Sequence, residues 1–183
     1  SDAVAGGRVR REDLFLVSKV GPKQHGYDAA LAACAASLER LRTPYLDLLL
    51  VHWPGAAKTP PDDPANAERR RETWRALEDA KAAGLTRAIG VSHFGESDFE
   101  ALAKTQKEPP VLNQCQLSVG KHDDATIAYC QSHGIVYQSY SPLCGGANGS
   151  SCSMGGGSSV LEIAQVIDIA HAHKVTPAQV GLK

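Results

Sequence analysis

The chain carries a short run, apolar except for Asp47, at Leu46-Asp47-Leu48-Leu49-Leu50-Val51 (residues 46–51), which ends directly before His52. Such a run is typical of a strand buried in a parallel sheet. Similar apolar runs lie on either side of it in the chain, at residues 14–17, 88–91, 111–115 and 135–139. The sequence therefore predicts five strands.

Longer amphipathic segments separate these runs, with apolar residues at helical spacing in 27–41, 73–83 and 125–133. Gly84 and Gly134 follow two of them, where glycine ends a helix because it accepts a positive φ. Further helices are expected at 160–173 and, from the capping pattern at 176–179, at the end of the chain. Alternating strands and helices predict the α/β class, either as a (β/α) barrel or as an open doubly wound sheet.

Two segments are expected to be loops: the Pro- and Ala-rich residues 55–66 and the Gly/Ser-rich residues 144–159. Each follows a strand, and loops after the carboxyl ends of parallel strands form the ligand-binding side of such folds. The Gly/Ser-rich segment fits a flexible linker as well as a loop that covers a cofactor.

Composition narrows the classes of partner. Lys+Arg of 19 against Asp+Glu of 20 gives a net charge of −1, which supplies no broad attraction to nucleic acid or anionic lipid. The basic run Arg69-Arg70-Arg71 lies among glutamates at helical spacing and is expected to be a solvated helix face. No apolar run approaches the roughly 20 residues that cross a bilayer. A small-molecule partner fits best.

Cysteine usage bears on location. The five cysteines are odd in number and show no zinc-ligand spacing, so we expect reduced thiols, no metal site and a cytoplasmic protein. The first seven residues do not form a signal peptide, and no initiator Met is present. We therefore expect the chain to be part of a longer protein.

Polar side chains follow or end each predicted strand, at the edge where ligands bind. These residues are Lys19, His52, Ser92, Gln114 and Tyr140. Each alone is commonly a capping or surface residue, but a set of five is unusual. Lys and His can polarise a carbonyl, Ser and Gln can hold an amide, and a Tyr ring can stack on a flat ring. The set suits reduction of a carbonyl by a nicotinamide, although neither G-x-G-x-x-G nor a P-loop is present.

Several motifs, in order, resemble those of aldo-keto reductases. They are residues 11–19 (REDLFLVSK), 45–54 (YLDLLLVHWP), 90–94 (GVSHF), 113–114 (NQ), 140–143 (YSPL) and 176–180 (TPAQV). The resemblance covers nearly the whole chain. It implies a (β/α)8 TIM barrel that binds NADPH without a Rossmann motif, with residues 1–183 forming one partial domain that holds strands three to seven of eight.

The resemblance also assigns catalytic and substrate residues. Lys19 and His52 would be two of the four catalytic residues, the Lys lowering the pKa of a proton-donating Tyr and the His orienting the carbonyl. Trp53 would line the substrate pocket. The remaining Asp and Tyr are expected upstream of residue 1, and Tyr27 and Tyr45 are not expected to replace the missing Tyr.

For the cofactor, the resemblance implies that Ser92, His93 and Gln114 hold the nicotinamide carboxamide and that Tyr140 stacks on the ring. Ser141 and Leu143 would lie near the pyrophosphate. His93 stands where the family has Asn, and an imidazole cannot reproduce the paired donor and acceptor of an amide. Residues 116–119 (QLSV) also replace the Glu-x-His-Pro that follows Asn-Gln in the family.

The implied function is NADPH-dependent reduction of an aldehyde, ketone or sugar carbonyl to an alcohol, by a protein that is monomeric when complete. The alternative is a catalytically inactive, truncated relative that binds NADPH or a protein partner as a sensor or scaffold. An unrelated TIM-barrel lyase or isomerase would leave the ordered motifs unexplained.

Overall fold

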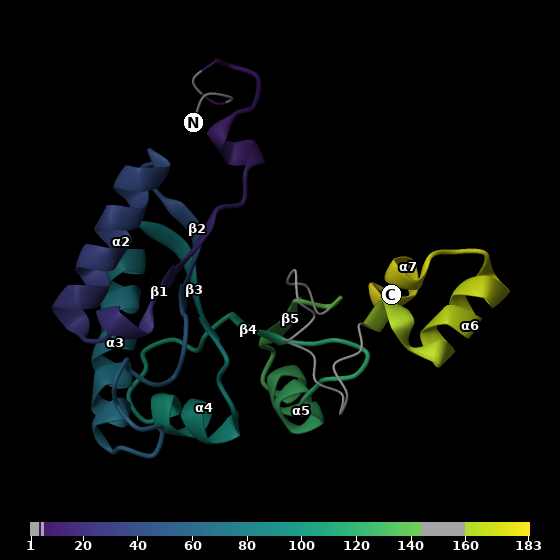
Figure 1. Cartoon of the computed structure of the whole chain (residues 1–183). Helices are drawn as coiled ribbons and strands as arrows, with labels where there is room; N and C mark the ends of the chain where they lie inside the picture. The colour runs from purple at the N-terminus through teal and green to yellow at the C-terminus, as the bar shows by residue number, and fades with distance from the viewer. Residues whose placement is uncertain (1–3, 5, 144–159) are drawn as a thin grey trace.

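The computed structural model describes residues 4, 6–143 and 160–183, and these contain one parallel sheet in the order β1-β2-β3-β4-β5 (Figure 1). Its strands are Val17–Val20 (β1), Leu46–Val51 (β2), Thr86–Ser92 (β3), Leu112–Gln116 (β4) and Val136–Tyr140 (β5). Neighbours in the sheet are neighbours in sequence, so every connection returns the chain to the same end of the sheet. The carboxyl ends of all five strands therefore lie along one edge.

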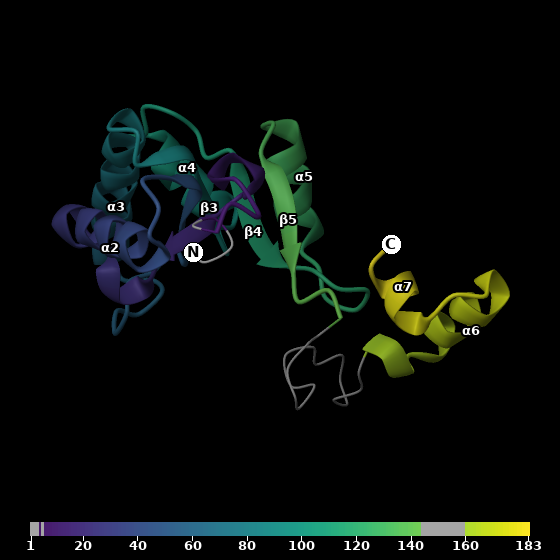
Figure 2. The ribbon, with the colours of Figure 1, turned by 90° about the horizontal axis from the view of Figure 1, so that it is seen from above.

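Helices fill the connections. They are Tyr27–Leu41 (α2), Ala65–Ala82 (α3), Glu96–Ala103 (α4), Asp124–Ser132 (α5), Ala164–His173 (α6) and Pro177–Gly181 (α7). Short 3-10 turns occupy Arg11–Asp13 (η1), Pro22–Gln24 (η2) and Val160–Glu162 (η3). In Figures 1 and 2, α6 and α7 form a separate pair beside the sheet.

The three predicted helix-end signals are present, and α5 has a further cap, at Asp123, that was not predicted. The Asp123 side chain accepts from Thr126 N at the start of α5, and Thr176 and Gln179 form a capping box at the start of α7. Gly84 and Gly134 have φ of 75° and 68°, as the predicted helix terminators require.

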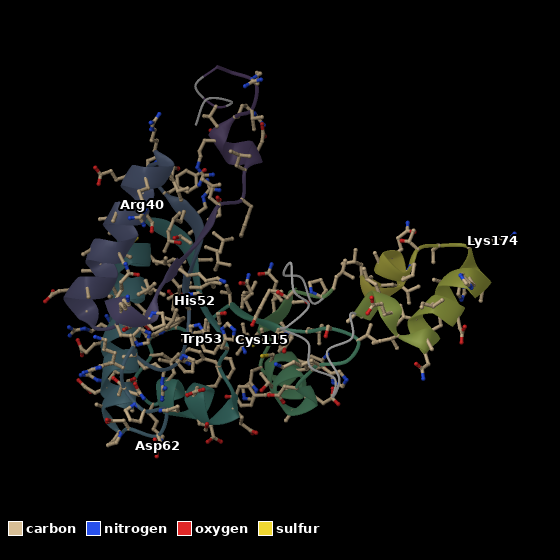
Figure 3. All side chains as sticks on the ribbon, in the orientation of Figure 1. Arg40, His52, Trp53, Asp62, Cys115 and Lys174 are labelled. Atoms are coloured by element: carbon tan, nitrogen blue, oxygen red, sulfur yellow. The ribbon has the colours of Figure 1, made fainter. Side chains whose placement is uncertain are left out.

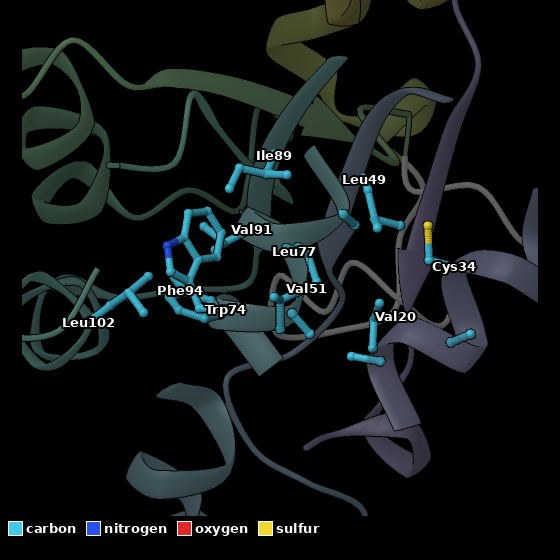
Figure 4. Close-up of a cluster of buried hydrophobic side chains, with 14 of the residues drawn as sticks. Val20, Cys34, Leu49, Val51, Trp74, Leu77, Ile89, Val91, Phe94 and Leu102 are labelled. Carbon is cyan, nitrogen blue, oxygen red and sulfur yellow. The ribbon is translucent and has the colours of Figure 1, made fainter. Parts of the chain in front are cut away.

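One face of the sheet packs on helices and forms the hydrophobic core (Figure 4). Leu49 and Val51 of β2 and Ile89 and Val91 of β3 pack there with Trp74 of α3. Side chains alternate along a strand, so the other face carries the intervening residues. On that face Val17 of β1 is 39% and Val136 of β5 is 59% exposed, whereas Leu48 and Leu50 of β2 are 2% and 0% exposed.

At the amino end of the sheet, the Asp47 carboxylate is hydrogen-bonded to three other residues. Its carboxylate accepts from Leu16 N at 2.8 Å, from Arg11 at 2.9 Å and from Arg87 at 3.2 Å. Burial raises the pKa of Asp47, but the Leu16 N–H and the Arg11 guanidinium outweigh burial and leave the pKa below its ordinary value. The polar residue inside the apolar run 46–51 thus has a structural role, at the end of the sheet opposite His52.

Three predictions about secondary structure were wrong. The first strand lies at 17–20 rather than 14–17, because Leu14 ends η1 and the Leu16 N–H bonds to the Asp47 side chain. Helix α3 begins at Ala65, inside the predicted loop 55–66 and eight residues before the predicted start at Thr73. Helix α4 was not predicted, because its eight residues give only two buried apolar positions, Phe99 and Leu102.

The prediction for the basic run was wrong at one residue. Arg71 pairs with Glu68 and Glu72 near the surface, as predicted. Arg70, however, is only 11% exposed, pairs with Asp98 at 3.0 Å and donates to the Pro54 carbonyl oxygen at 2.9 Å. It therefore holds the segment after His52 and Trp53 against α4.

Candidate active site

The two predicted catalytic residues lie at the carboxyl ends of adjacent strands. Lys19 pairs with Leu50 in the β1–β2 register, and the His52 N–H donates to the Val20 carbonyl oxygen at 3.0 Å. Figure 3 shows His52 and Trp53 where the strands end. The sheet therefore brings together two residues that are 33 positions apart in sequence.

The charge of Lys19 contributes to the lowered pKa of His52. Among the described residues the Lys19 ammonium has no hydrogen-bond or ion-pair partner, and burial lowers its pKa. Burial also lowers the pKa of His52 below 6.5, and the charges of Lys19 and His93 lower it further. At neutral pH this edge therefore presents an unpaired ammonium beside a neutral imidazole.

Trp53 stacks on the ring of His93. The two ring centroids are 3.5 Å apart and the planes differ by 12°. Trp53 is nevertheless 43% exposed, so one face of the indole packs on His93 while the side chain still reaches solvent.

Both ring nitrogens of His93 are hydrogen-bonded to other groups of the protein. Nδ1 lies 3.0 Å from the His52 carbonyl oxygen, and Nε2 lies 2.9 Å from the Tyr140 hydroxyl. A carbonyl oxygen only accepts, so Nδ1 carries the proton and Nε2 accepts from Tyr140 in the neutral ring. Its φ of 61° is left-handed, a conformation in which Asn and His are both enriched. The backbone thus explains why a His can stand in an Asn position.

Ser92 and Gln114 lie next to His93 in neighbouring strands, as β3 pairs Ser92 with Gln114 of β4. Ser92 is fully buried, and its hydroxyl donates to the Gln114 carbonyl oxygen at 2.6 Å. The Gln114 side chain is partly exposed and donates to Gln138 Oε1 at 2.6 Å. Of these polar groups the Gln114 amide is the more accessible to a ligand.

Tyr140 is the last residue of β5, and Ser141 and Leu143 follow it in the chain. Burial raises the pKa of the Tyr140 phenol, so its hydroxyl stays protonated. Ser141 has a left-handed φ of 51°, which turns the chain away from the sheet. Next to it, a hollow of about 460 Å³ is lined by Ser139, Pro142 and Gly181, among others. The predicted loop 144–159, with Cys144 and Cys152, lies outside the described residues.

Two residues at this edge were missed by sequence reasoning. Gln138 lies two positions before Tyr140, and strand alternation would have placed both on one face. His25 lies between η2 and α2 with neither ring nitrogen in a standard hydrogen bond, and burial lowers its pKa to about 4, with Arg70 adding to the effect. No periodic signal marks His25, because it lies in a turn.

The described part of the chain shows neither a membrane-spanning helix nor a cluster of metal-ligating side chains. No helix there combines the length and the apolar character that a membrane span requires. No group of three or more His, Cys, Asp or Glu side chains gathers there as metal ligands would. Cys34, Cys115 and Cys130 are free thiols and buried.

Comparisons with known proteins give one answer. The model of the aldo/keto reductase family matches residues 2–183. Aldo-keto reductase AKR2E4 of Bombyx mori is 38% identical over 143 residues, which are 78% of this chain and 46% of the relative. Glyoxal reductase of Bacillus subtilis (strain 168) is 36% identical over 175 residues, which are 96% of this chain and 55% of the relative.

The fold also matches that of a solved aldo-keto reductase structure. The crystal structure of Bombyx mori AKR2E4 in complex with NADP superposes with a TM-score of 0.83 at 32% identity, covering 99% of this chain and 58% of that chain. The chain thus spans about half the length of the curated relatives that it matches.

Proposed function

The chain belongs to the aldo/keto reductase family, and from this we propose that it takes part in NADPH-dependent reduction of an aldehyde, ketone or sugar carbonyl to an alcohol. The parallel sheet is accordingly a five-strand part of that family's (β/α)8 barrel. The observation that carries the proposal is the convergence of Lys19, His52, Gln114 and Tyr140 at one edge of this sheet.

The residues at the edge fit a nicotinamide. Gln114 offers an accessible amide to the carboxamide, and the partly exposed ring of Tyr140 offers a flat surface for stacking. Ser92 and His93 would position these two residues. The Ser92 hydroxyl donates to the main-chain carbonyl oxygen of Gln114, and the His93 ring is hydrogen-bonded to the Tyr140 hydroxyl. Ser141 and Leu143 remain our candidates for the neighbourhood of the pyrophosphate.

When bound, the nicotinamide supplies a hydride to the carbonyl carbon. The unpaired Lys19 ammonium would stabilise the anion left on a nearby proton-donating hydroxyl, which makes that hydroxyl a stronger acid. Neutral His52 can donate a hydrogen bond from its ring to the carbonyl oxygen and so orient it. Trp53, beside His52, would form the apolar wall of the substrate pocket.

Charge and cysteine usage bear on the partner and the location of the protein. The near-zero net charge and the buried free thiols support a small carbonyl substrate as the partner and a cytoplasmic location, with no nucleic-acid or membrane partner. We also propose that residues 1–183 belong to one barrel domain and that the complete protein is monomeric.

The test is aldehyde-dependent oxidation of NADPH by the native protein that contains this chain, followed by the absorbance of the reduced nicotinamide. We expect loss of absorbance only when protein, NADPH and a small aldehyde are all present. Binding of NADPH without turnover of any aldehyde, ketone or sugar would instead support the inactive, sensor-type alternative.

A further inference from the structure

Gln138 and Gln114 form a pair of amides on the face of the sheet that points away from the hydrophobic core. The β4–β5 register sets Gln114 directly opposite Gln138, and Gln114 Nε2 donates to Gln138 Oε1 at 2.6 Å. Gln138 is exposed, and no other hydrogen bond of its side chain is found among the described residues. Its amide is therefore poised for a ligand and has no further structural partner there.

The pair presents a fixed combination of polar atoms. One hydrogen bond between two primary amides uses one N–H and one oxygen, which leaves an oxygen on one glutamine and an amide nitrogen on the other. The same combination remains if both amides are turned over. An adjacent acceptor and donor match a primary carboxamide, which itself has one C=O and one NH2 group.

The neighbouring side chains of His93 and Ser92 do not offer this combination. The His93 ring is bonded through Nδ1 to the His52 carbonyl oxygen and through Nε2 to Tyr140. The Ser92 hydroxyl is buried and donates to the Gln114 carbonyl oxygen. Gln114 and Gln138 thus offer the free acceptor and donor that His93 and Ser92 lack.

We propose that Gln138 is a cofactor-binding residue that recognises, together with Gln114, both halves of the nicotinamide carboxamide. The inference rests on the proposed function, since it takes NADPH as the ligand. Strand β5 would thus bind the carboxamide through Gln138, in addition to stacking Tyr140 on the nicotinamide ring.

Gln138→Leu tests the inference, because it keeps the approximate size of the side chain and removes both polar atoms at an exposed position. Gln138, whose oxygen already accepts from Gln114, would donate its free N–H to the carboxamide carbonyl oxygen. The dissociation constants of NADPH and of its thionicotinamide analogue, which keeps the NH2 group but has the weaker acceptor sulfur in place of the carbonyl oxygen, are measured by Trp53 fluorescence in the native protein. We expect Gln138→Leu to weaken NADPH by about two- to ten-fold for each hydrogen bond lost. The preference for NADPH over the analogue should shrink at the same time.

Gln131→Leu is the matched control, because it makes the same change at an exposed position of α5 and should leave both constants unchanged. Unchanged binding of both ligands by Gln138→Leu would overturn the inference. A weaker NADPH complex with an unchanged preference would also overturn it, since Gln138 would then act on the fold alone. Failure of the wild-type protein to bind NADPH would instead overturn the proposed function.

Discussion

Replacing Lys19 by Met should lower kcat for aldehyde reduction by about 10²–10⁴-fold, the usual range for a group that assists proton transfer. Lys19 lies one residue before the end of β1, and its ammonium has no partner among the described residues. Met keeps the length of the side chain and removes the charge. NADPH affinity should stay close to the wild-type value, because Lys19 is proposed to act on the proton donor and the substrate.

The same substitution has a second readout that does not depend on turnover. The charge of Lys19 contributes to the lowered pKa of His52, so the pKa of His52 should rise towards 6.5 in Lys19→Met, as measured by NMR titration. Lys23→Met is the control, because this exposed lysine of η2 is not placed in the site. Equal rates for Lys19→Met and the wild type would contradict the assigned role.

Replacing Gly90 by Val should destabilise the fold by more than about 3 kcal/mol, at the upper end of overpacking costs. A Cβ at Gly90 would lie 2.7 Å from the Leu112 carbonyl oxygen and 2.8 Å from Leu50 Cδ2. The first contact is with backbone, so it can be relieved only by moving β4 away from β3. Urea or thermal unfolding measures the effect.

Gly95→Ser is the matched control for Gly90→Val. Gly95 precedes α4 with a φ of −96°, and a Cβ there meets no atom within 4 Å. Ser is a favoured residue at the start of a helix, so stability should be unchanged or slightly higher. Wild-type stability of Gly90→Val would show that β3 and β4 are not packed as described.

The fold was largely predictable because strands and helices repeat with strong periodicity. The limits of β2 agree with the run 46–51, and those of α2 with 27–41, since both have clear apolar patterns. The start of β1 was misplaced because its neighbour Leu16 bonds to a side chain, Asp47, that lies 31 residues away. Helix α4 was missed because a two-turn helix gives too few apolar positions for a period.

The site was predictable in its location but only partly in its interactions. Strand ends fixed the positions of Lys19, His52, Gln114 and Tyr140, because carboxyl ends of parallel strands share one edge. Sequence could not show that the His93 ring bonds to Tyr140 and stacks on Trp53, since these contacts depend on side-chain geometry across three connections. Gln138 was overlooked because its partner Gln114 is known only from the β4–β5 register.

Titration of tryptophan fluorescence shows whether the carboxyl edge beside Trp53 binds the nicotinamide of NADPH. Trp53 lies at this edge, whereas Trp74 is buried in the core. In the native protein, NADPH should quench the emission with saturation, and Trp53→Phe should remove that quenching while Trp74 still emits. Saturable quenching that persists unchanged in Trp53→Phe, or no binding of NADPH by the wild type, would contradict the account.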